Sequence, residues 1–106
     1  MPQKVLSVTE AAAKLTDPFT HTVLGQVDGY CAYLSRFSGS YKFHDHAKDE
    51  MYVVLEGEVC IDYGDGTCTL LGEGDTLVVK ANEVHRSRSE EGALVMMFKA
   101  VHLFAE

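Results

Sequence analysis

The chain has 106 residues, and its 46% hydrophobic and 24% charged residues are typical of one globular domain spanning residues 1–106. Its 16 acidic and 9 basic residues give a formal net charge of −7 at pH 7. This charge argues against nucleic acid and against an anionic membrane surface as partners, because both are recognised through basic patches.

The N-terminus and the cysteines bear on the cellular compartment. The opening segment, MPQKVLSVTE, contains no apolar stretch of the kind that a secretion signal requires. No run approaches the roughly 20 apolar residues that span a bilayer. Cys31, Cys60 and Cys68 are odd in number and scattered, so we expect reduced thiols and no disulfide. Together these features predict a cytoplasmic protein.

One helix is expected, close to the N-terminus. Ser7 and Glu10 have the spacing of a capping box, and the strong helix formers of residues 11–15 follow them. Asp17 precedes Pro18, and a residue before proline avoids the helical conformation. We therefore expect a helix of about two turns that ends by this point.

The rest of the chain has the pattern of short strands separated by turns. Residues 19–27 and 30–37 flank Asp28-Gly29, a dipeptide that favours a tight hairpin. Further strands are expected at 51–55, 59–63, 67–71, 76–80, 84–86 and 93–103, with Glu90-Glu91-Gly92 as the turn before the last. Short strands at such regular spacing predict an all-β sandwich or barrel.

Two of the expected strands are apolar on both faces. In residues 51–55 and 94–98 neither alternate set is polar, whereas a strand with one solvated face should alternate. The second face needs a cover, which either the N-terminal helix or another subunit can provide. Because small oligomers are mostly symmetric dimers, we expect a homodimer. The alternative is an ordinary strand that local loops cover.

Four candidate metal ligands are spread along the strand-rich region. His44 and His46 are two residues apart, so their imidazoles would share one face of an extended segment. Glu50 can return to that face after a short loop, and His85 follows a later strand. Three imidazoles and a carboxylate favour one divalent transition metal, such as iron, manganese, nickel or zinc, over calcium. Open coordination positions would admit water, dioxygen or a chelating substrate.

Several further residues are candidates for a substrate pocket. Tyr52 shares a face with Glu50 by alternation, so it lies near the metal or is a core residue with a hydrogen-bonded hydroxyl. The other candidates lie on strands before and after the motif: Tyr33, Arg36 and Phe37, and then Met96 and Phe98 or, alternatively, Met97.

Other charged and titratable residues have weaker signals. Arg86 and Arg88 either anchor an anionic group of a substrate or pair at the surface with the acidic residues at 90 and 91. His21 and His102 have no partner at ligand spacing, and we expect no role for them.

The pattern of glycines and ligands resembles the small, single-domain cupins. His-x-His-x3-Glu-x6-Gly, ending at Gly57 and preceded by Gly39, is similar to the first cupin motif. Gly74 and His85, with a strand between them, are similar to the second. Asn82 stands where the second motif usually has glycine, which is compatible because Asn tolerates a left-handed turn. The resemblance covers residues 37–98.

Resemblance to cupins implies a double-stranded β-helix, or jelly roll, with a barrel core at about residues 30–100 and the metal inside. It also implies a wide choice of chemistry, because one fold hosts many functions. We expect a metalloenzyme, dioxygenase-like or isomerase-like, that acts on a small polar or anionic metabolite. The alternative is a non-catalytic module that binds or senses a small ligand.

Overall fold

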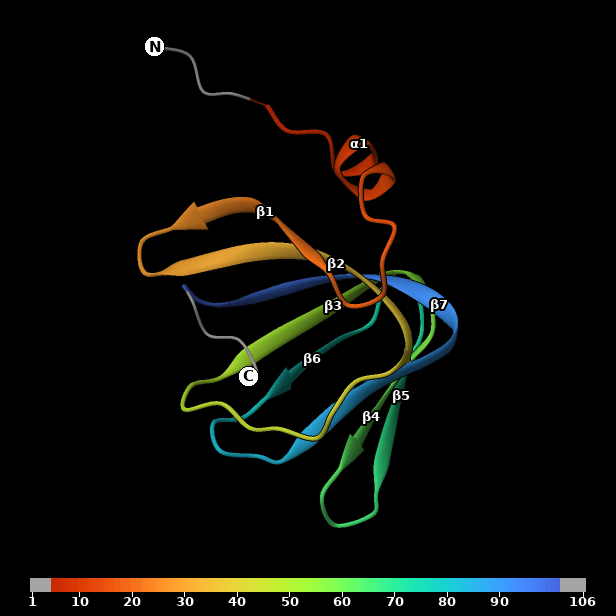
Figure 1. Ribbon diagram of the computed structural model, residues 1–106. Helices are drawn as coiled ribbons and strands as arrows, with labels where there is room; N and C mark the ends of the chain where they lie inside the picture. Colours follow the sequence, from red (N-terminus) through yellow and green to blue (C-terminus); the bar gives the residue numbers. More distant parts are fainter. Residues whose placement is uncertain (1–4, 102–106) are drawn as a thin grey trace.

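The computed structural model describes residues 5–101, so His102 and the end of the last expected strand lie outside the described residues. The described chain contains a short helix, α1 (Val8–Ala13), followed by strands only. The strands are β1 (His21–Val27), β2 (Tyr30–Ser40), β3 (Glu50–Gly57), β4 (Val59–Tyr63), β5 (Cys68–Leu71), β6 (Thr76–Val79) and β7 (His85–Ala100). The predicted all-β class with one N-terminal helix is confirmed (Figure 1).

The helix begins where its capping signal predicts. The Ser7 hydroxyl accepts a hydrogen bond from the backbone N–H of Glu10 at 3.2 Å, which satisfies one of the unpaired N–H groups of the first turn. Arg36 of β2 donates to the carbonyl oxygens of Leu15, at 3.0 Å, and Ala12, at 3.1 Å. These bonds fasten the end of the helix to the outside of the sheet.

The strands pair in antiparallel fashion around β7. The main sheet has the order β1-β2-β7-β3-β6, and the β4–β5 hairpin joins through a second pairing of β4 with β7. The C-terminal half of β7 lies between β2 and β3, while its N-terminal residues pair with β4. In Figure 1, β7 curves from the hairpin of β4 and β5 towards the sheet that lies below α1. One long strand therefore links both parts of the barrel.

The turn expected at Glu90-Glu91-Gly92 is wrong, because β7 continues through it as a single strand of 16 residues. The register with β2 shifts there: Phe37 is opposite Ala93, but Gly39 is opposite Ser89. Gly92 has a φ of 93°, which a glycine adopts without strain. The extra residues form a bulge that bends the strand from one part of the barrel to the other.

Inward-facing side chains fill the barrel, and α1 covers part of its outside. The core includes Tyr33, Phe37, Tyr52, Val54, Val59, Ile61, Val79, Val95 and Met97. A second cluster joins Ala12 and Leu15 of the helix region to Leu34 and Leu94 on the outward face of the sheet. The N-terminal helix is thus one of the covers that the two-faced apolar strands required.

Beyond the helix, the outward face of the sheet remains apolar. We call Met51, Val53, Val78, Met96 and Phe98 the outer apolar face; Met51 is opposite Val78 and Phe98, and Val53 is opposite Met96. Val78 is 46% exposed and the others are half-buried. The homodimer expected from this pattern stays a prediction. No helix of the described chain is long and apolar enough to cross a membrane.

Candidate metal centre

The barrel brings the three histidines of the two motifs together. The ligand nitrogens of His44, His46 and His85 all lie within 4.8 Å of one another. His85 is fully buried, His46 is buried and His44 is half-buried. Glu50 stands beside them at the start of β3, with its Oε1 atom 3.6 Å from Nε2 of His85 and its Oε2 atom 3.8 Å from Nε2 of His46. The sequence-predicted donors are therefore neighbours in space.

The loop that carries His46 is tied to the turn before the second motif. The backbone N–H of Asn82 donates to the carbonyl oxygen of His46 at 2.7 Å, and Asn82 has the left-handed φ, 65°, expected for its position. The Asp49 carboxylate accepts bonds from Lys80 Nζ, at 2.8 Å, and from the backbone N–H of Ala81, at 2.9 Å. These bonds fix the loop against the turn that precedes His85.

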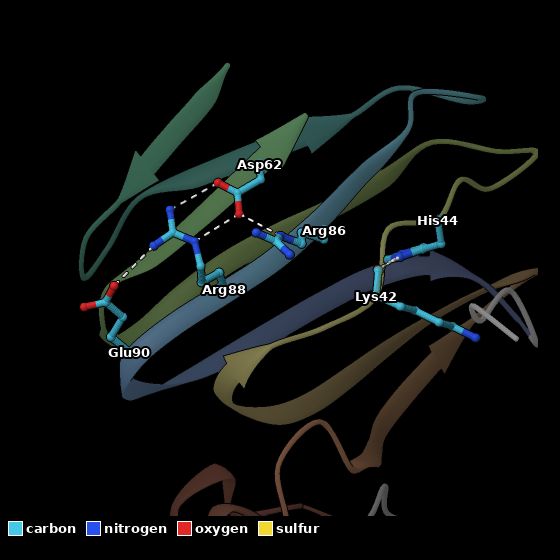
Figure 2. A network of polar contacts seen from close by, with 6 residues as sticks. All are labelled: Lys42, His44, Asp62, Arg86, Arg88 and Glu90. Atoms are coloured by element: carbon cyan, nitrogen blue, oxygen red, sulfur yellow. Dashed lines mark hydrogen bonds and ion pairs between the residues drawn. The ribbon is translucent and has the colours of Figure 1, made fainter. Parts of the chain in front are cut away.

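Two backbone carbonyls orient the imidazole rings of His44 and His85. His44 Nδ1 is 2.8 Å from the carbonyl oxygen of Lys42, a contact shown in Figure 2, and His85 Nδ1 is 2.8 Å from that of Glu83. A carbonyl oxygen only accepts, so each Nδ1 must carry the proton and donate. Each Nε2 then bears the lone pair, and a second contact of this kind is usual for a metal-binding histidine. Both Nε2 atoms are thereby prepared to ligate an ion.

Two buried polar atoms of the cluster lack the partner that such atoms normally have. His46 Nε2 and Glu50 Oε1 are inaccessible to solvent, and neither makes a hydrogen bond within residues 5–101. Buried polar groups are almost always paired, so each unpaired one requires an explanation. A divalent ion among the Nε2 atoms and Oε1 would satisfy both. The residues present therefore fit the metal that the motifs imply.

The electrostatics of the histidines also suit metal binding, which needs neutral imidazoles. Burial lowers the pKa of His44 and of His46, so both are neutral near pH 7. Burial also acts to lower the pKa of His85, but its contacts with Glu50 and the carbonyl of Glu83 outweigh burial and raise that pKa. In the absence of an ion, His85 is thus the histidine most inclined to hold a proton beside Glu50.

Lys99 is a part of the site that the sequence did not indicate. Its Nζ lies 2.8 Å from Oε2 of Glu50, and the two side chains are 4% and 1% exposed. Burial acts to raise the pKa of Glu50, but the contacts with His85 and Lys99 outweigh it and lower that pKa to about 2. Glu50 is therefore ionised at neutral pH. Lysine is usually solvent-facing, so its sequence context suggested no interior position.

A small cavity adjoins this cluster. Its volume is about 50 Å³, enough for a few water molecules or a ligand of a few atoms. The aromatic rings of Phe19, Phe37 and Tyr41 form one side of it, while Glu50 and Lys99 contribute charged groups. Such a mixture of apolar walls and a few converging polar groups is typical of a small-molecule site.

The structure places the predicted pocket residues on two different faces. Tyr52 lines the cavity, and its hydroxyl is 3.4 Å from Nε2 of His85. Burial raises the pKa of Tyr52 well above its ordinary value, so the hydroxyl keeps its proton. Tyr33 also faces the interior, with its ring 5.5 Å from that of His21. His21 itself lines the cavity, although the sequence suggested no role for it.

The placement of Arg36, Met96 and Phe98 in the pocket is wrong. Arg36 is bonded to the helix end on the outward face, and Met96 and Phe98 belong to the outer apolar face. Met97 lies between them on the inward side and lines the cavity, as the alternative assignment had it. Successive side chains of a strand point to opposite faces, but this strand is apolar on both faces. The sequence therefore does not show which alternate set of residues points inward.

Arg86 and Arg88 pair chiefly with Asp62 of β4 and do not face the cavity. Figure 2 shows both guanidinium groups converging on this carboxylate. Oδ2 of Asp62 is 2.9 Å from Nε of Arg86 and 3.0 Å from Nε of Arg88, and Arg88 also reaches Glu90 at 3.5 Å. The structure supports ion pairing outside the cavity for these arginines, but the main partner is Asp62, and of the two predicted acidic partners Glu90 contacts Arg88 alone.

Comparisons with known proteins agree with the architecture. A family model described as "Cupin domain" matches residues 37–101. The uncharacterized protein YdbB of Bacillus subtilis (strain 168) is 32% identical over 87 residues, which are 81% of this chain and 77% of YdbB.

Solved structures show the same fold. A cupin-2 domain protein from Shewanella frigidimarina superposes with a TM-score of 0.86 at 22% identity, covering 91% of this chain and 94% of that one. Hydroquinone 1,2-dioxygenase PnpCD, solved with Cd²⁺ and 4-hydroxybenzonitrile, gives a TM-score of 0.74 at 18% identity, covering 94% and 80%. These matches confirm the predicted jelly roll.

Proposed function

The chain belongs to the cupin family, and from this premise we propose that it is a metal-dependent enzyme, dioxygenase-like or isomerase-like, acting on a small polar or anionic molecule. The observation that carries the proposal is the pair of orphaned buried atoms, His46 Nε2 and Glu50 Oε1, beside the Nε2 atoms of two oriented histidines. His44, His46, Glu50 and His85 would hold the ion. Bound there, a divalent metal would supply Lewis acidity or oxygen chemistry.

The surrounding residues define what the site can do with a small molecule. The rings of Phe19 and Phe37, 5.1 Å apart, limit access of water to one side of the cavity. The hydroxyl of Tyr52 keeps its proton and can donate a hydrogen bond to an oxygen of the ligand. A cavity of about 50 Å³ excludes large metabolites unless the walls move. These features favour a compact substrate with oxygen atoms.

The reaction type depends on the metal. PnpCD is a hydroquinone 1,2-dioxygenase, but at 18% identity the likeness of this chain to it extends to the fold alone. Iron would favour oxygen chemistry here, whereas zinc or manganese would favour isomerase-like or lyase-like chemistry. Elemental analysis of protein purified without added metal is therefore the first measurement.

A second candidate is a non-catalytic module that binds or senses a small ligand. The small cavity favours it, and so does the absence, among the described cavity residues, of a carboxylate besides Glu50 that could act as a base. In that case a ligand would raise the melting temperature of the metal-loaded protein without being converted. An enzyme would convert at least one member of a panel of small oxygen-containing acids.

The proposal can be refuted by measuring the metal content and metal uptake of the protein. It is wrong if the purified protein carries no stoichiometric metal and neither His46→Ala nor Glu50→Ala changes metal uptake. The proposal also includes a cytoplasmic location, which the three free cysteines support, and a homodimer formed through the outer apolar face.

A further inference from the structure

A lysine inside the barrel faces the carboxylate of the candidate centre. Lys99 on β7 is directly opposite Glu50 on β3 in the antiparallel register, and both residues are buried. Directly opposite residues of neighbouring strands bring their side chains together on one face. A buried ammonium is costly unless it is paired, so the register places Lys99 where this cost is offset. The contact is thus part of the barrel's construction and differs from a chance ion pair at a surface.

The contact makes the two oxygens of Glu50 chemically different. Oε2 accepts a hydrogen bond from Nζ of Lys99 at 2.8 Å. Oε1 has no hydrogen-bond partner within the described chain and lies 3.6 Å from Nε2 of His85. One oxygen is therefore engaged by the protein, and the other is available among the histidines.

We propose that Lys99 is a positioning residue that makes Glu50 a one-oxygen ligand of the metal centre. This inference rests on the proposed function, because it requires the ion. A carboxylate without such a neighbour can bind a cation through both oxygens. With Oε2 held by Lys99, the protein supplies one oxygen, Oε1, and the Nε2 atoms of the three histidines.

The arrangement determines which ligands the centre can accept. An ion with about six ligands would keep two positions open, whereas a two-oxygen Glu50 would leave one. Two open positions admit a small molecule that chelates through two oxygens, such as a hydroxy acid or a hydroxamate. Lys99 also places a positive charge near the cation, which weakens metal binding. Lys99 thus lowers the affinity of the centre for the metal and leaves a second coordination position open to a ligand.

Two substitutions at one position test this role. Lys99→Met removes the ammonium and keeps an unbranched side chain, while Lys99→Arg keeps a cation. With Co²⁺ as the probe, we expect Lys99→Met to bind the ion about tenfold more tightly, or better, and to change its visible absorption spectrum. Lys99→Arg should stay closer to the wild type in both respects. An unchanged affinity and spectrum in folded Lys99→Met would overturn the inference.

A measurement on the wild-type protein covers the case in which Lys99→Met fails to fold. The infrared difference spectrum between the Co²⁺-loaded and metal-free protein distinguishes one-oxygen from two-oxygen carboxylate ligands by the separation of the two stretching bands. Glu50→Gln identifies the bands. We expect the one-oxygen pattern, and a two-oxygen pattern would overturn the role of Lys99 alone. Wild-type protein that takes up no Co²⁺ would overturn the metal centre itself and this inference with it.

Discussion

His44 and His85 exchange both of their backbone hydrogen bonds, with each N···O distance at 2.9 Å. This isolated bridge joins the two motifs at the residues that would bind the metal, and the centroids of the two imidazole rings are 4.4 Å apart. The relative position of the two histidines is therefore set by the backbone and does not depend on contacts of their rings. Removal of one imidazole should leave the other in place, which makes single substitutions informative.

Tyr52→Phe tests whether the hydroxyl competes with the metal. The hydroxyl of Tyr52 is 3.4 Å from Nε2 of His85, the atom that would ligate the ion, so metal binding would replace this contact. The substitution removes a hydrogen bond worth about 1 kcal/mol, so the free energy of unfolding should fall by about that amount. Co²⁺ affinity, measured by calorimetric titration, should be equal to that of the wild type or higher. Weaker binding would show that Tyr52 supports the centre directly.

Gly57→Ala should destabilise the fold strongly. Gly57 has a φ of 81°, and an added Cβ would lie 2.4 Å from the carbonyl oxygen of Gly92 in the bulge of β7. Because both atoms are fixed by the backbone, we expect a loss of about 3 kcal/mol or more in the free energy of unfolding, measured in urea. Gly66→Ala is the matched control, since Gly66 has a φ of 90° but open space around it. It should lose about 1 kcal/mol, and equal losses would contradict this account.

Asp62 should make stability depend on pH in the acid range. Hydrogen bonds from Arg88 and Arg86 lower the pKa of Asp62 from 3.8 to about 2. A carboxylate with a lowered folded-state pKa stabilises the fold above its unfolded pKa, and this contribution is lost as pH falls from about 4 to about 2. Asp62→Asn should therefore cost about 1–2 kcal/mol at pH 7 and only a small part of that near pH 2.

The control for that titration is Glu73→Gln, which removes a negative charge from an exposed turn residue. Its effect on the free energy of unfolding should be within about 0.5 kcal/mol of zero at every pH. If the cost of Asp62→Asn stayed constant between pH 7 and pH 2, the two arginine contacts would not be the source of the lowered pKa.

The outer apolar face predicts a homodimer. An isologous contact places the same patch against itself, and this patch contains no charged side chain that would meet its own sign. Val78→Lys introduces a charge at its 46% exposed edge and should shift the protein to monomer in sedimentation velocity. Leu70→Lys, at a residue that is 62% exposed on β5, should leave the dimer intact. A monomeric wild type, or a dimeric Val78→Lys, would refute this interface.

The local signals of the sequence were sufficient for most of the barrel. Ser7 begins the helix, Asp28-Gly29 joins β1 to β2, and β4 has the expected residues 59–63. The three histidines and Glu50 are adjacent as their motif spacing implied. These features depend on short-range chemistry, namely caps, turn dipeptides and alternation, which a sequence displays directly.

Features that depend on tertiary context were missed. The glycine of a bulge and the glycine of a turn both need a positive φ, so Gly92 did not reveal that β7 continues. Because β7 is apolar on both faces, the sequence did not show which of its residues point inward. Met96 and Phe98 were therefore expected in the pocket, with Met97 as the alternative. Nothing in the sequence distinguishes Lys99 from a surface lysine, because only the register opposite Glu50 explains its burial. In each case a distant segment decides the outcome.

The central claim is that His44, His46, His85 and Glu50 hold one divalent ion, and Co²⁺ titration of matched histidine variants tests it most directly. His46→Ala removes an orphaned ligand atom, while His21→Ala removes a cavity histidine outside the cluster. We expect one equivalent of Co²⁺ in the wild type and in His21→Ala, and affinity at least about a hundredfold weaker in His46→Ala. Equal binding by the two variants, or no stoichiometric binding by the wild type, would contradict the account.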